Sequence, residues 1–340
     1  MGEDACCNVT CGCCCETAIQ NVSTTLSFKD ILGAWKVRWG FGRMDYAVAP
    51  GMYGVGNPDG GSPVLVSANY KLTFDVLRKN LAGVDCWLLI LDTKGVNVWC
   101  AAGKGTFGTD ELVRRIEAVG LPALVSHRRL ILPQLGASGV SSHEVTKRTG
   151  FTVLFGPVRA SDLREYISSG YQATEEMRAV KFTFWDRLVL IPMELVEAAK
   201  VSVVVFGVLF LLNLFAARPF GRADFLIYLA ATLCGAALTP ALLPFIPGKA
   251  FAFKGWLLGL SGTAWIAWAY GWFNPPLLLL GIGYILTLPV YSAFIAMNFT
   301  GASTYTSPSG VQKEMRLALP LMVVSFAAGI ILILLKAFIG

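Results

Sequence analysis

The residue best suited to chemistry in this chain is a single cysteine, Cys100, within the stretch NVWCAAGKGTFG at 97–108. A cysteine thiolate is both a nucleophile and a soft ligand for metal ions. The stretch follows an apolar run, CWLLILD at 86–92, and precedes TDELVRRIEAVG, which starts at Thr109 and has apolar residues at helical spacing. Cys100 is therefore expected at a junction between a strand and a helix.

Two other roles for Cys100 have weaker support. A thiol hydrolase requires a histidine base and a third orienting group, and nothing in the sequence favours His127 or His143 as that base. A free cysteine is often a small buried hydrophobic residue, and this is the expectation for Cys86 and Cys234. The small residues after Cys100 and its place beyond a strand end instead favour a thiol that faces a ligand.

The composition divides the chain into a soluble part and a lipid-embedded part. Of its 340 residues, 55% are hydrophobic and only 15% are charged, and the mean hydropathy is +0.59. These values are too apolar for an ordinary soluble domain. Of the 50 charged residues, 41 lie in 1–200 and nine in 201–340, so the second part is expected to lie in a membrane.

Five apolar segments in the second part are long enough to cross a bilayer, which takes about 20 residues per helix. Near their ends, Lys and Arg number eight on the side that holds the first 200 residues and three on the other side. This asymmetry predicts that the soluble part is cytoplasmic. The five segments are 198–217, 224–243, 251–272, 277–299 and 317–338.

The net charge of +6 is explained by the same basic residues. The sequence has no basic stripe with interleaved aromatic residues, so a nucleic acid partner is not expected.

The soluble part has the pattern of an α/β domain. Apolar runs at 63–69, 86–92, 129–133 and 151–156 alternate with stretches of helical periodicity. This alternation predicts a mostly parallel sheet with helices on its faces. Ligands bind at the carboxyl ends of the strands in such sheets, and Cys100 follows the end of the second run.

The first residues of the chain are rich in cysteine. Six of the nine cysteines lie in CCNVTCGCCC at 6–15, too close together for a disulfide framework. The segment is interpreted either as a flexible tail or as a handler of soft metals. The predicted division of the chain is a Cys-rich tail at 1–34, the α/β domain at 35–180, a linker or juxtamembrane helix at 181–197 and the transmembrane part at 198–340.

The stretch around Cys100 resembles the cap-helix signature N-[VI]-W-C-A-[AG]-G-K of the mercury-methylating corrinoid proteins (HgcA), with all eight positions from Asn97 to Lys104 matching. The resemblance covers about 35–340. The α/β domain is also similar to the corrinoid domain in the large subunit of the corrinoid iron-sulfur protein of acetyl-CoA synthesis, which has no cysteine matching Cys100. Four further stretches resemble the mercury-methylating family, namely 64–78, 130–139, 153–163 and 299–315.

The resemblance implies an α/β Rossmann-like corrinoid-binding domain followed by an all-α transmembrane bundle of about five helices in the cytoplasmic (cell inner) membrane. It implies an enzyme that transfers a methyl group from methyl-Co(III) to inorganic Hg(II), giving methylmercury. The cofactor is a corrinoid of the cobalamin type, and the Cys100 thiolate is the lower axial ligand of its cobalt. A soft anionic sulfur donates electron density to cobalt, which makes the opposite methyl group easier to lose with its electrons. Transfer to an electrophile such as Hg(II) requires a methyl group that leaves with its electrons.

The resemblance also implies a set of corrinoid contacts besides Cys100. Ala101, Ala102, Gly103 and Gly105 are small enough to let a helix lie close to a flat ring. Two roles stay open for Trp99, which either anchors the helix in the core or touches the corrinoid, and for Lys104, which either favours the thiolate or points to solvent. The implied contacts are Asn97, Val98, Trp99, Ala101, Ala102, Gly103, Lys104, Gly105, Thr106 and Phe107 around the cysteine, and Asn69, Tyr70, Thr73, Gln134, Leu135, Gly136, Ala137, Gly156 and Pro157 in neighbouring loops.

The partners implied by the resemblance are a ferredoxin-like iron-sulfur electron donor (HgcB type), Hg(II), a methyl donor from the tetrahydrofolate pathway and the lipid bilayer. Two other functions remain open. One is a membrane-tethered corrinoid methyl carrier for another acceptor. The other is a non-enzymatic protein that binds or transports soft metals.

Overall fold

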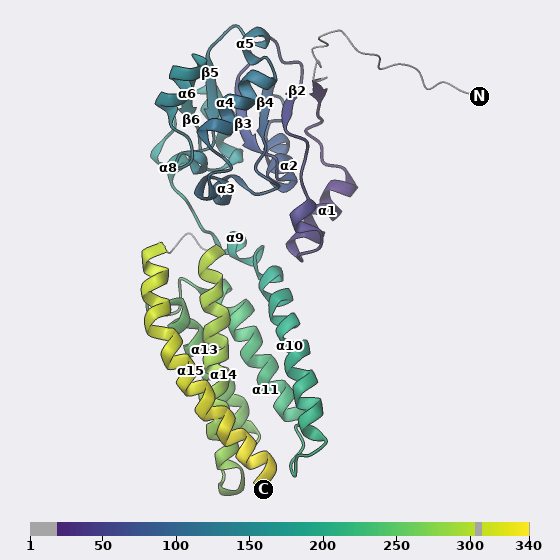
Figure 1. The fold of residues 1–340 in the computed structure, drawn as a ribbon, viewed down its shortest axis with the longest axis vertical. Coiled ribbons are helices and arrows are strands. Elements are labelled where there is room, and N and C mark those ends of the chain that lie inside the picture. Colours follow the sequence, from purple (N-terminus) through teal and green to yellow (C-terminus); the bar gives the residue numbers. More distant parts are fainter. Residues whose placement is uncertain (1–18, 303–307, 340) are drawn as a thin grey trace, which may run out of the picture. The chain divides into compact units, whose positions relative to one another are not determined.

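The computed structural model describes residues 19–302 and 308–339. The cysteine cluster at 6–15 lies outside the described residues, so its two interpretations stay open. An α/β part is followed by a helical part, as the sequence predicts (Figure 1). Contacts divide the described chain into a sheet unit of 19–35 and 42–179, and a helical unit of 36–41, 180–302 and 308–339.

Six strands form one sheet in the order β1-β2-β4-β3-β5-β6. The strands β3 to β6 are parallel and occupy the four apolar runs expected as strands. β2 is antiparallel to β4, and β1 is parallel to β2. The sequence pattern predicts neither of these, because β1 has two residues and β2, GMYGV, contains two glycines. The strands are β1 Gln20–Asn21, β2 Gly51–Val55, β3 Val64–Ala68, β4 Cys86–Leu91, β5 Arg129–Leu132 and β6 Thr152–Phe155.

The order of the parallel strands reverses at β3. From β3 the chain crosses to β4 on one side, and from β4 it returns past β3 to β5 on the other side. In open α/β sheets, ligands bind beyond the carboxyl ends of the strands at such a reversal. The loops that follow β3, β4 and β5 are therefore the expected place for a site.

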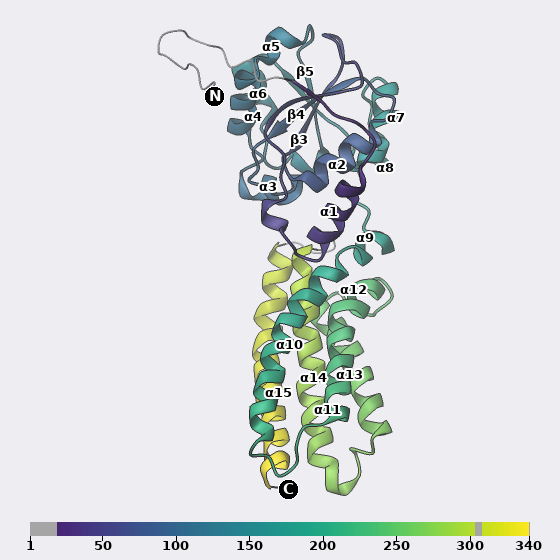
Figure 2. The ribbon, with the colours of Figure 1, turned by 90° about the vertical axis from the view of Figure 1, so that its right-hand side faces the viewer.

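Helices cover both faces of the sheet (Figure 2). Val64, Val66 and Leu89 pack on one face with residues of α3, α4 and α6, while Leu65 and Leu88 pack on the other face with residues of α2 and α7. Strands buried on both faces appear in a sequence as continuous apolar runs, which is why the sequence located them. The helices are α2 Lys71–Asn80, α3 Val98–Lys104, α4 Thr109–Ala118, α5 Leu121–Leu124, α6 Ser142–Thr149, α7 Leu163–Ser168 and α8 Glu175–Arg178.

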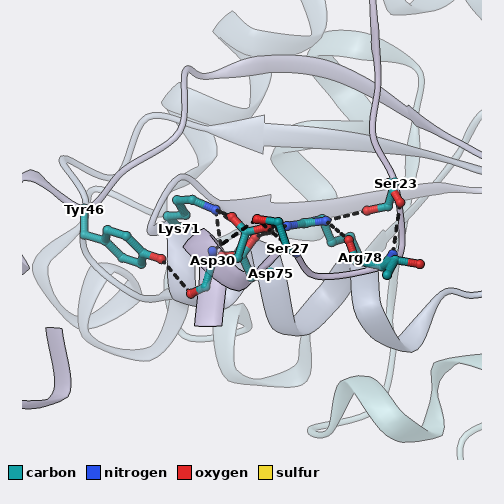
Figure 3. Close-up of polar contacts among 8 residues, drawn as sticks. Ser23, Ser27, Asp30, Tyr46, Lys71, Asp75 and Arg78 are labelled. Atoms are coloured by element: carbon teal, nitrogen blue, oxygen red, sulfur yellow. Dashed lines mark hydrogen bonds and ion pairs between the residues drawn. The ribbon is translucent and has the colours of Figure 1, made fainter. Parts of the chain in front are cut away.

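An ion-pair network holds the first turn of helix α1, Phe28–Arg38, to helix α2 (Figure 3). Asp30 accepts hydrogen bonds from Lys71 at 2.7 Å and from Arg78 at 2.8 Å. Asp75 also accepts from both cations, at 2.7 Å from Lys71 and 2.8 Å from Arg78. Asp75 is 2% exposed and Arg78 is 7% exposed. Two carboxylates and two cations thus neutralise one another inside the sheet unit.

In the helical unit, four described segments are long and apolar enough to cross a membrane. They support the prediction of a membrane protein, and Figure 1 shows their helices running alongside one another. The expected linker at 181–197 is largely helical, because it contains α9 and the first turns of α10. The four segments are Phe184–Asn213, Arg222–Leu242, Pro275–Asn298 and Ser309–Phe338. Their helices are α9 Phe184–Leu188, α10 Ile191–Asn213, α11 Arg222–Leu233, a π-helical turn at Cys234–Leu238, α12 Thr239–Leu242, α14 Leu278–Asn298 and α15 Pro308–Ile339.

The fifth expected span, 251–272, is not among these four segments. It forms helix α13, Phe251–Ala269, which contains Lys254, three tryptophans and several small residues. A Cβ added at Gly259 would meet Ser292 at 2.6 Å, so α13 packs closely against α14. Close approach of small residues is the usual way in which membrane helices associate. Four of the five predicted spans therefore meet the length and apolarity of a membrane helix among the described residues, and the fifth forms a 19-residue helix packed beside them.

Candidate functional site

The loop between β4 and α3 is organised by the side chain of Asn69, which follows β3. Its Oδ1 accepts hydrogen bonds from the backbone N–H of Thr93 at 3.1 Å, the hydroxyl of Thr93 at 2.8 Å and the N–H of Gly95 at 3.0 Å. Asn69 is buried, and the Thr93 hydroxyl shares its single hydrogen between Asn69 Oδ1 and the Val96 carbonyl oxygen, which lies 2.6 Å away. Asn69 therefore fixes the path of the chain into α3. The sequence missed Thr93, although it is a polar residue directly beyond a strand end.

Helix α3 begins with a side-chain cap. Asn97 is the N-cap residue, and its Oδ1 accepts a hydrogen bond from the backbone N–H of Cys100 at 2.9 Å. An asparagine at this position satisfies one of the N–H groups that a helix leaves unpaired. Asn97 thus positions the turn that carries the cysteine.

Replacing Asn97 by alanine is expected to destabilise α3 by about 1 kcal/mol, the usual cost of losing such a cap. Hydrogen exchange of the segment 96–105 measures this, and faster exchange is expected. Asn97→Asp is the matched control, because it keeps a capping oxygen and should exchange like the unchanged protein. Equal exchange in the alanine and aspartate variants would contradict the capping role.

The faces of α3 are sharply divided between core and solvent. Val98, Ala101 and Ala102 are buried in the core of the sheet unit, whereas Cys100 is exposed. Trp99 is 42% exposed, so the core contacts of this helix are made by other residues and not by the tryptophan. The outward face consists of Trp99, Cys100, Gly103, Lys104 and Gly105.

The end of α3 is closed by Gly105, whose φ of 79° is in the left-handed region that glycine adopts readily. Thr106 is half-buried, and Phe107 is completely buried and belongs to the core. Gly103, Gly105 and Gly108 have the GxGxxG spacing of a dinucleotide-binding loop. That motif requires a strand directly before the glycines, but here a helix precedes them, so the spacing does not indicate such a site.

The loop after β5 lies directly against α3. A Cβ added at Gly136 would meet the Phe107 ring at 2.5 Å, and one added at Gly139 would meet the Phe107 carbonyl oxygen at 2.2 Å and Ala102 Cα at 3.0 Å. Only glycine permits this contact. Gly139 was not among the expected site residues, although it lies in the same glycine-containing loop.

The remaining expected contacts lie at the same carboxyl edge, because each follows a parallel strand or begins the helix after it. Gly156 and Pro157 are buried beyond β6, where the Gly156 N–H donates to the Leu132 carbonyl at 2.8 Å. Tyr70 is buried and packs edge to face on Tyr46. The half-buried members of the set are Thr73, Gln134, Leu135 and Ala137.

A buried polar atom at this edge has no protein partner. The Oε1 of Gln134, directly beyond β5, is buried and accepts no hydrogen bond from any described residue. Such an atom costs free energy unless a ligand or water donates to it. Gln134 is therefore available to an N–H or O–H donor of a bound molecule.

Cys100 is not part of a preformed metal-binding cluster of the described side chains. Among the residues that the structure describes, no group of three or more His, Cys, Asp or Glu side chains is placed to hold a metal ion. The Nε2 atom of His127 is hydrogen-bonded to the Ser62 carbonyl oxygen at 2.9 Å. His127 lies before β5, at the opposite edge of the sheet from Cys100. Cys100 would be a single thiolate ligand.

The surface beside Cys100 on α3 is open, because a Cβ added at Gly103 or Gly105 would meet no protein atom within 4 Å. The Gln134 Oε1, which lacks a partner among the described residues, lies at the same edge of the sheet.

The sheet unit, with its strand reversal and the small residues at its carboxyl edge, has the design of a ligand-binding α/β domain. Residues 42–167 match the family model described as the delta subunit of CO dehydrogenase/acetyl-CoA synthase. This match includes Cys100 and all the expected site residues. The helical unit from residue 180 onward lies outside it.

The curated relatives are gamma subunits of the acetyl-CoA decarbonylase/synthase complex. The chain is 34% identical over 131 residues to the subunit of Methanocaldococcus jannaschii and 36% identical over 122 residues to that of Methanopyrus kandleri. These alignments cover 38% and 35% of this chain, and in both cases 26% of the relative. The chain therefore spans about a quarter of the length of these relatives. The comparisons support the expected similarity to the corrinoid domain of acetyl-CoA synthesis.

Proposed function

We propose that this protein is a membrane-bound, corrinoid-dependent methyltransferase that methylates inorganic Hg(II). The observation that carries the proposal is the exposed thiol of Cys100 on a helix of small residues at the carboxyl edge of the sheet, within the segment similar to the acetyl-CoA relatives. When bound, the corrinoid would supply a cobalt atom that carries the methyl group. The Cys100 thiolate would be the protein ligand of that cobalt.

The residues around Cys100 have distinct roles in this proposal. Asn69 and Asn97 fix the start of α3, and the buried Ala101 and Ala102 hold the helix to the core, so that the sulfur has a defined position. Gly103 has no side chain, so it leaves the outer surface of α3 beside Cys100 open to a bound ring. Gln134 offers its unpaired Oε1 to an amide N–H of the bound ring.

The chemistry of sulfur favours an electrophilic acceptor. A thiolate is a softer and stronger donor than a neutral nitrogen ligand. It therefore favours departure of a methyl group together with its electron pair, which is the form that Hg(II) accepts. This argument selects mercury over a nucleophilic acceptor.

A methyl carrier for another acceptor is the second candidate function. The names of the relatives refer to acetyl-CoA and not to mercury, and this observation favours it. Incubation of the methylated protein with Hg(II) separates the two candidates, because the first requires methylmercury as product. Transfer to a different acceptor without methylmercury would support the second, and purified protein that takes up no corrinoid would leave only soft-metal binding or transport.

The proposal extends to partners and location. The four apolar helices support insertion in the cytoplasmic membrane, and the excess of basic residues on one side supports a cytoplasmic sheet unit. A ferredoxin-like iron-sulfur protein would return the cobalt to its reduced state, and a methyltetrahydrofolate-dependent donor would supply the methyl group. These partners rest on the sequence resemblance.

The variant Gly103→Leu tests whether a broad group lies on α3. Its side chain would meet no protein atom near the Cβ, and removing a glycine from a helix stabilises the fold by about 0.5–1 kcal/mol. Corrinoid affinity should nevertheless fall by about tenfold or more, or about 1.4 kcal/mol, because leucine would occupy the space of the ring.

Titration followed by the corrinoid absorption spectrum measures this affinity. Lys79→Leu is the matched control, because Lys79 is exposed in the last turn of α2, at the other edge of the sheet. Unchanged corrinoid affinity in Gly103→Leu would show that the ring does not lie on this surface.

A further inference from the structure

Helix α1 has an apolar face that is exposed. Phe28, Ile31, Leu32 and Trp35 follow the spacing i, i+3, i+4, i+7, which places them on one side of the helix. All four are exposed, up to 79% for Phe28 and 60% for Trp35. A helix of a soluble domain buries such a face against its core. In α1 the apolar face points outward instead.

The opposite face of α1 is the one that packs on the sheet unit (Figure 3). Asp30 binds Lys71 and Arg78 of α2 through the ion-pair network. A Cβ added at Gly33 would meet the Tyr46 hydroxyl oxygen at 2.5 Å, so the backbone of α1 lies against that side chain. These contacts fix the rotation of the helix. The apolar side chains therefore point outward because the ion pairs and the glycine occupy the inward face.

The charge on α1 identifies what can cover this face. The acidic residue Asp30 is neutralised by its ion pairs, whereas Lys29, Lys36 and Arg38 add positive charge to the same helix. Basic residues are attracted to anionic lipid headgroups, and tryptophan is enriched where headgroups meet the hydrocarbon. An amphipathic helix with this combination lies in the plane of a membrane surface.

We propose that the outward face of α1, formed by Phe28, Ile31, Leu32 and Trp35, is a membrane-interface surface that contacts phospholipid. The same chain has four described segments that are long and apolar enough to cross a bilayer. The ion-pair network connects this surface to Lys71, which begins α2 directly beyond the carboxyl end of β3. The proposal does not depend on the identity of the cofactor or the methyl acceptor.

Photocrosslinking in the full-length protein tests this contact. A benzoyl-phenylalanine photocrosslinker replaces Ile31 or Trp35, one at a time, in protein reconstituted in nanodiscs of phosphatidylglycerol and phosphatidylcholine. Val76 on α2 is the matched control position, because its side chain is 45% exposed and that of Ile31 is 47% exposed. Mass spectrometry identifies the adducts after irradiation, and hydrogen exchange of α2 verifies that each variant is folded.

Phospholipid adducts are expected at positions 31 and 35, several-fold above the yield at position 76. Adducts mainly with other segments of this chain would overturn the proposal, since α1 would then be covered by protein. A lipid yield no higher than that at position 76 would also overturn it.

Discussion

Replacement of Cys100 by alanine is expected to reduce methylmercury formation by at least about 100-fold, because changes to groups that only support a metal ligand already cost up to about 100-fold. The fold should persist, since the thiol is exposed and the cap uses the backbone N–H of Cys100, which alanine retains. Alanine is also a good helix former. The measurement is methylmercury produced from Hg(II) by purified protein that carries methylated corrinoid.

Two further observations make this experiment decisive. The absorption spectrum of the bound corrinoid should change in Cys100→Ala, because a ligand of the cobalt has been removed. The matched control is Cys86→Ala, since burial and the charge of Asp85 raise the pKa of Cys86 to about 12, so that its thiol is neutral at physiological pH. The control should stay active with an unchanged spectrum. An alanine variant at position 100 that methylates mercury at the original rate would refute the ligand role.

Replacement of Arg78 by methionine is expected to lower the free energy of unfolding of the sheet unit by about 3–5 kcal/mol, the usual cost of removing one partner from a buried ion pair. Among the described residues, Asp75 and Asp30 would keep Lys71 alone as a cationic partner. Arg78 also donates to the Ser23 carbonyl at 2.5 Å, so the segment before α1 would be released. Hydrogen exchange of the peptides from α2 and β3 as a function of urea measures the change.

Arg114→Met is the matched control for this variant. Arg114 pairs with Glu111 on the surface of α4, and its side chain is 66% exposed. Exposed ion pairs contribute little because water and salt screen them, so the effect on unfolding should be much smaller. Equal effects of the two variants would show that the network at α2 contributes no more than a surface pair.

The same network predicts how stability depends on pH. Burial raises the pKa of Asp30, but hydrogen bonds from Lys71, Ser27 and Arg78 outweigh it and hold the pKa well below its ordinary value. The contribution of Asp30 is therefore fully present above the ordinary carboxyl pKa of about 3.9 and is lost as the pH falls below that value. In Arg78→Met the loss should again begin near the ordinary carboxyl pKa, but it should be smaller and end at a higher pH, because a hydrogen bond that lowers the folded-state pKa of Asp30 is gone.

At alkaline pH the sign is opposite. Burial lowers the pKa of Lys71, but hydrogen bonds to Asp30 and Asp75 outweigh it and raise the pKa above its ordinary value. The contribution of Lys71 is present below the ordinary lysine pKa of about 10.4 and is lost as the pH rises through the raised value. Stability from this network should thus be constant across the neutral range.

The sequence by itself determined the features that depend on local patterns. Strands β3 to β6 are buried on both faces, so each is a continuous apolar run that needs no knowledge of its neighbours. The four membrane-length helices follow from length and apolarity in the same way. The position of Cys100 beyond the end of β4 could also be predicted, because the apolar run of β4 and the small residues around the cysteine lie close together in the chain.

The roles of individual residues in the site could not be read from these patterns. Asn69 was expected as a cofactor contact, but its side chain binds Thr93 and Gly95, which lie 24 and 26 residues further along the chain. Phe107 belongs to the core, where Gly136 and Gly139 pack against it. Each of these contacts joins segments that are distant in the sequence, and a residue type alone does not specify its partner.

Only the tertiary structure decided the strand order, the outward face of α1 and the packing of α13. The pairing of β2 with β4 and the reversal at β3 are long-range choices that leave no periodic signal. The apolar stripe of α1 predicts an inward face by itself, and the contacts of Asp30 with α2 reverse it. Periodicity reports only that a helix has two different faces, whereas the side chains that meet each face determine which one is buried.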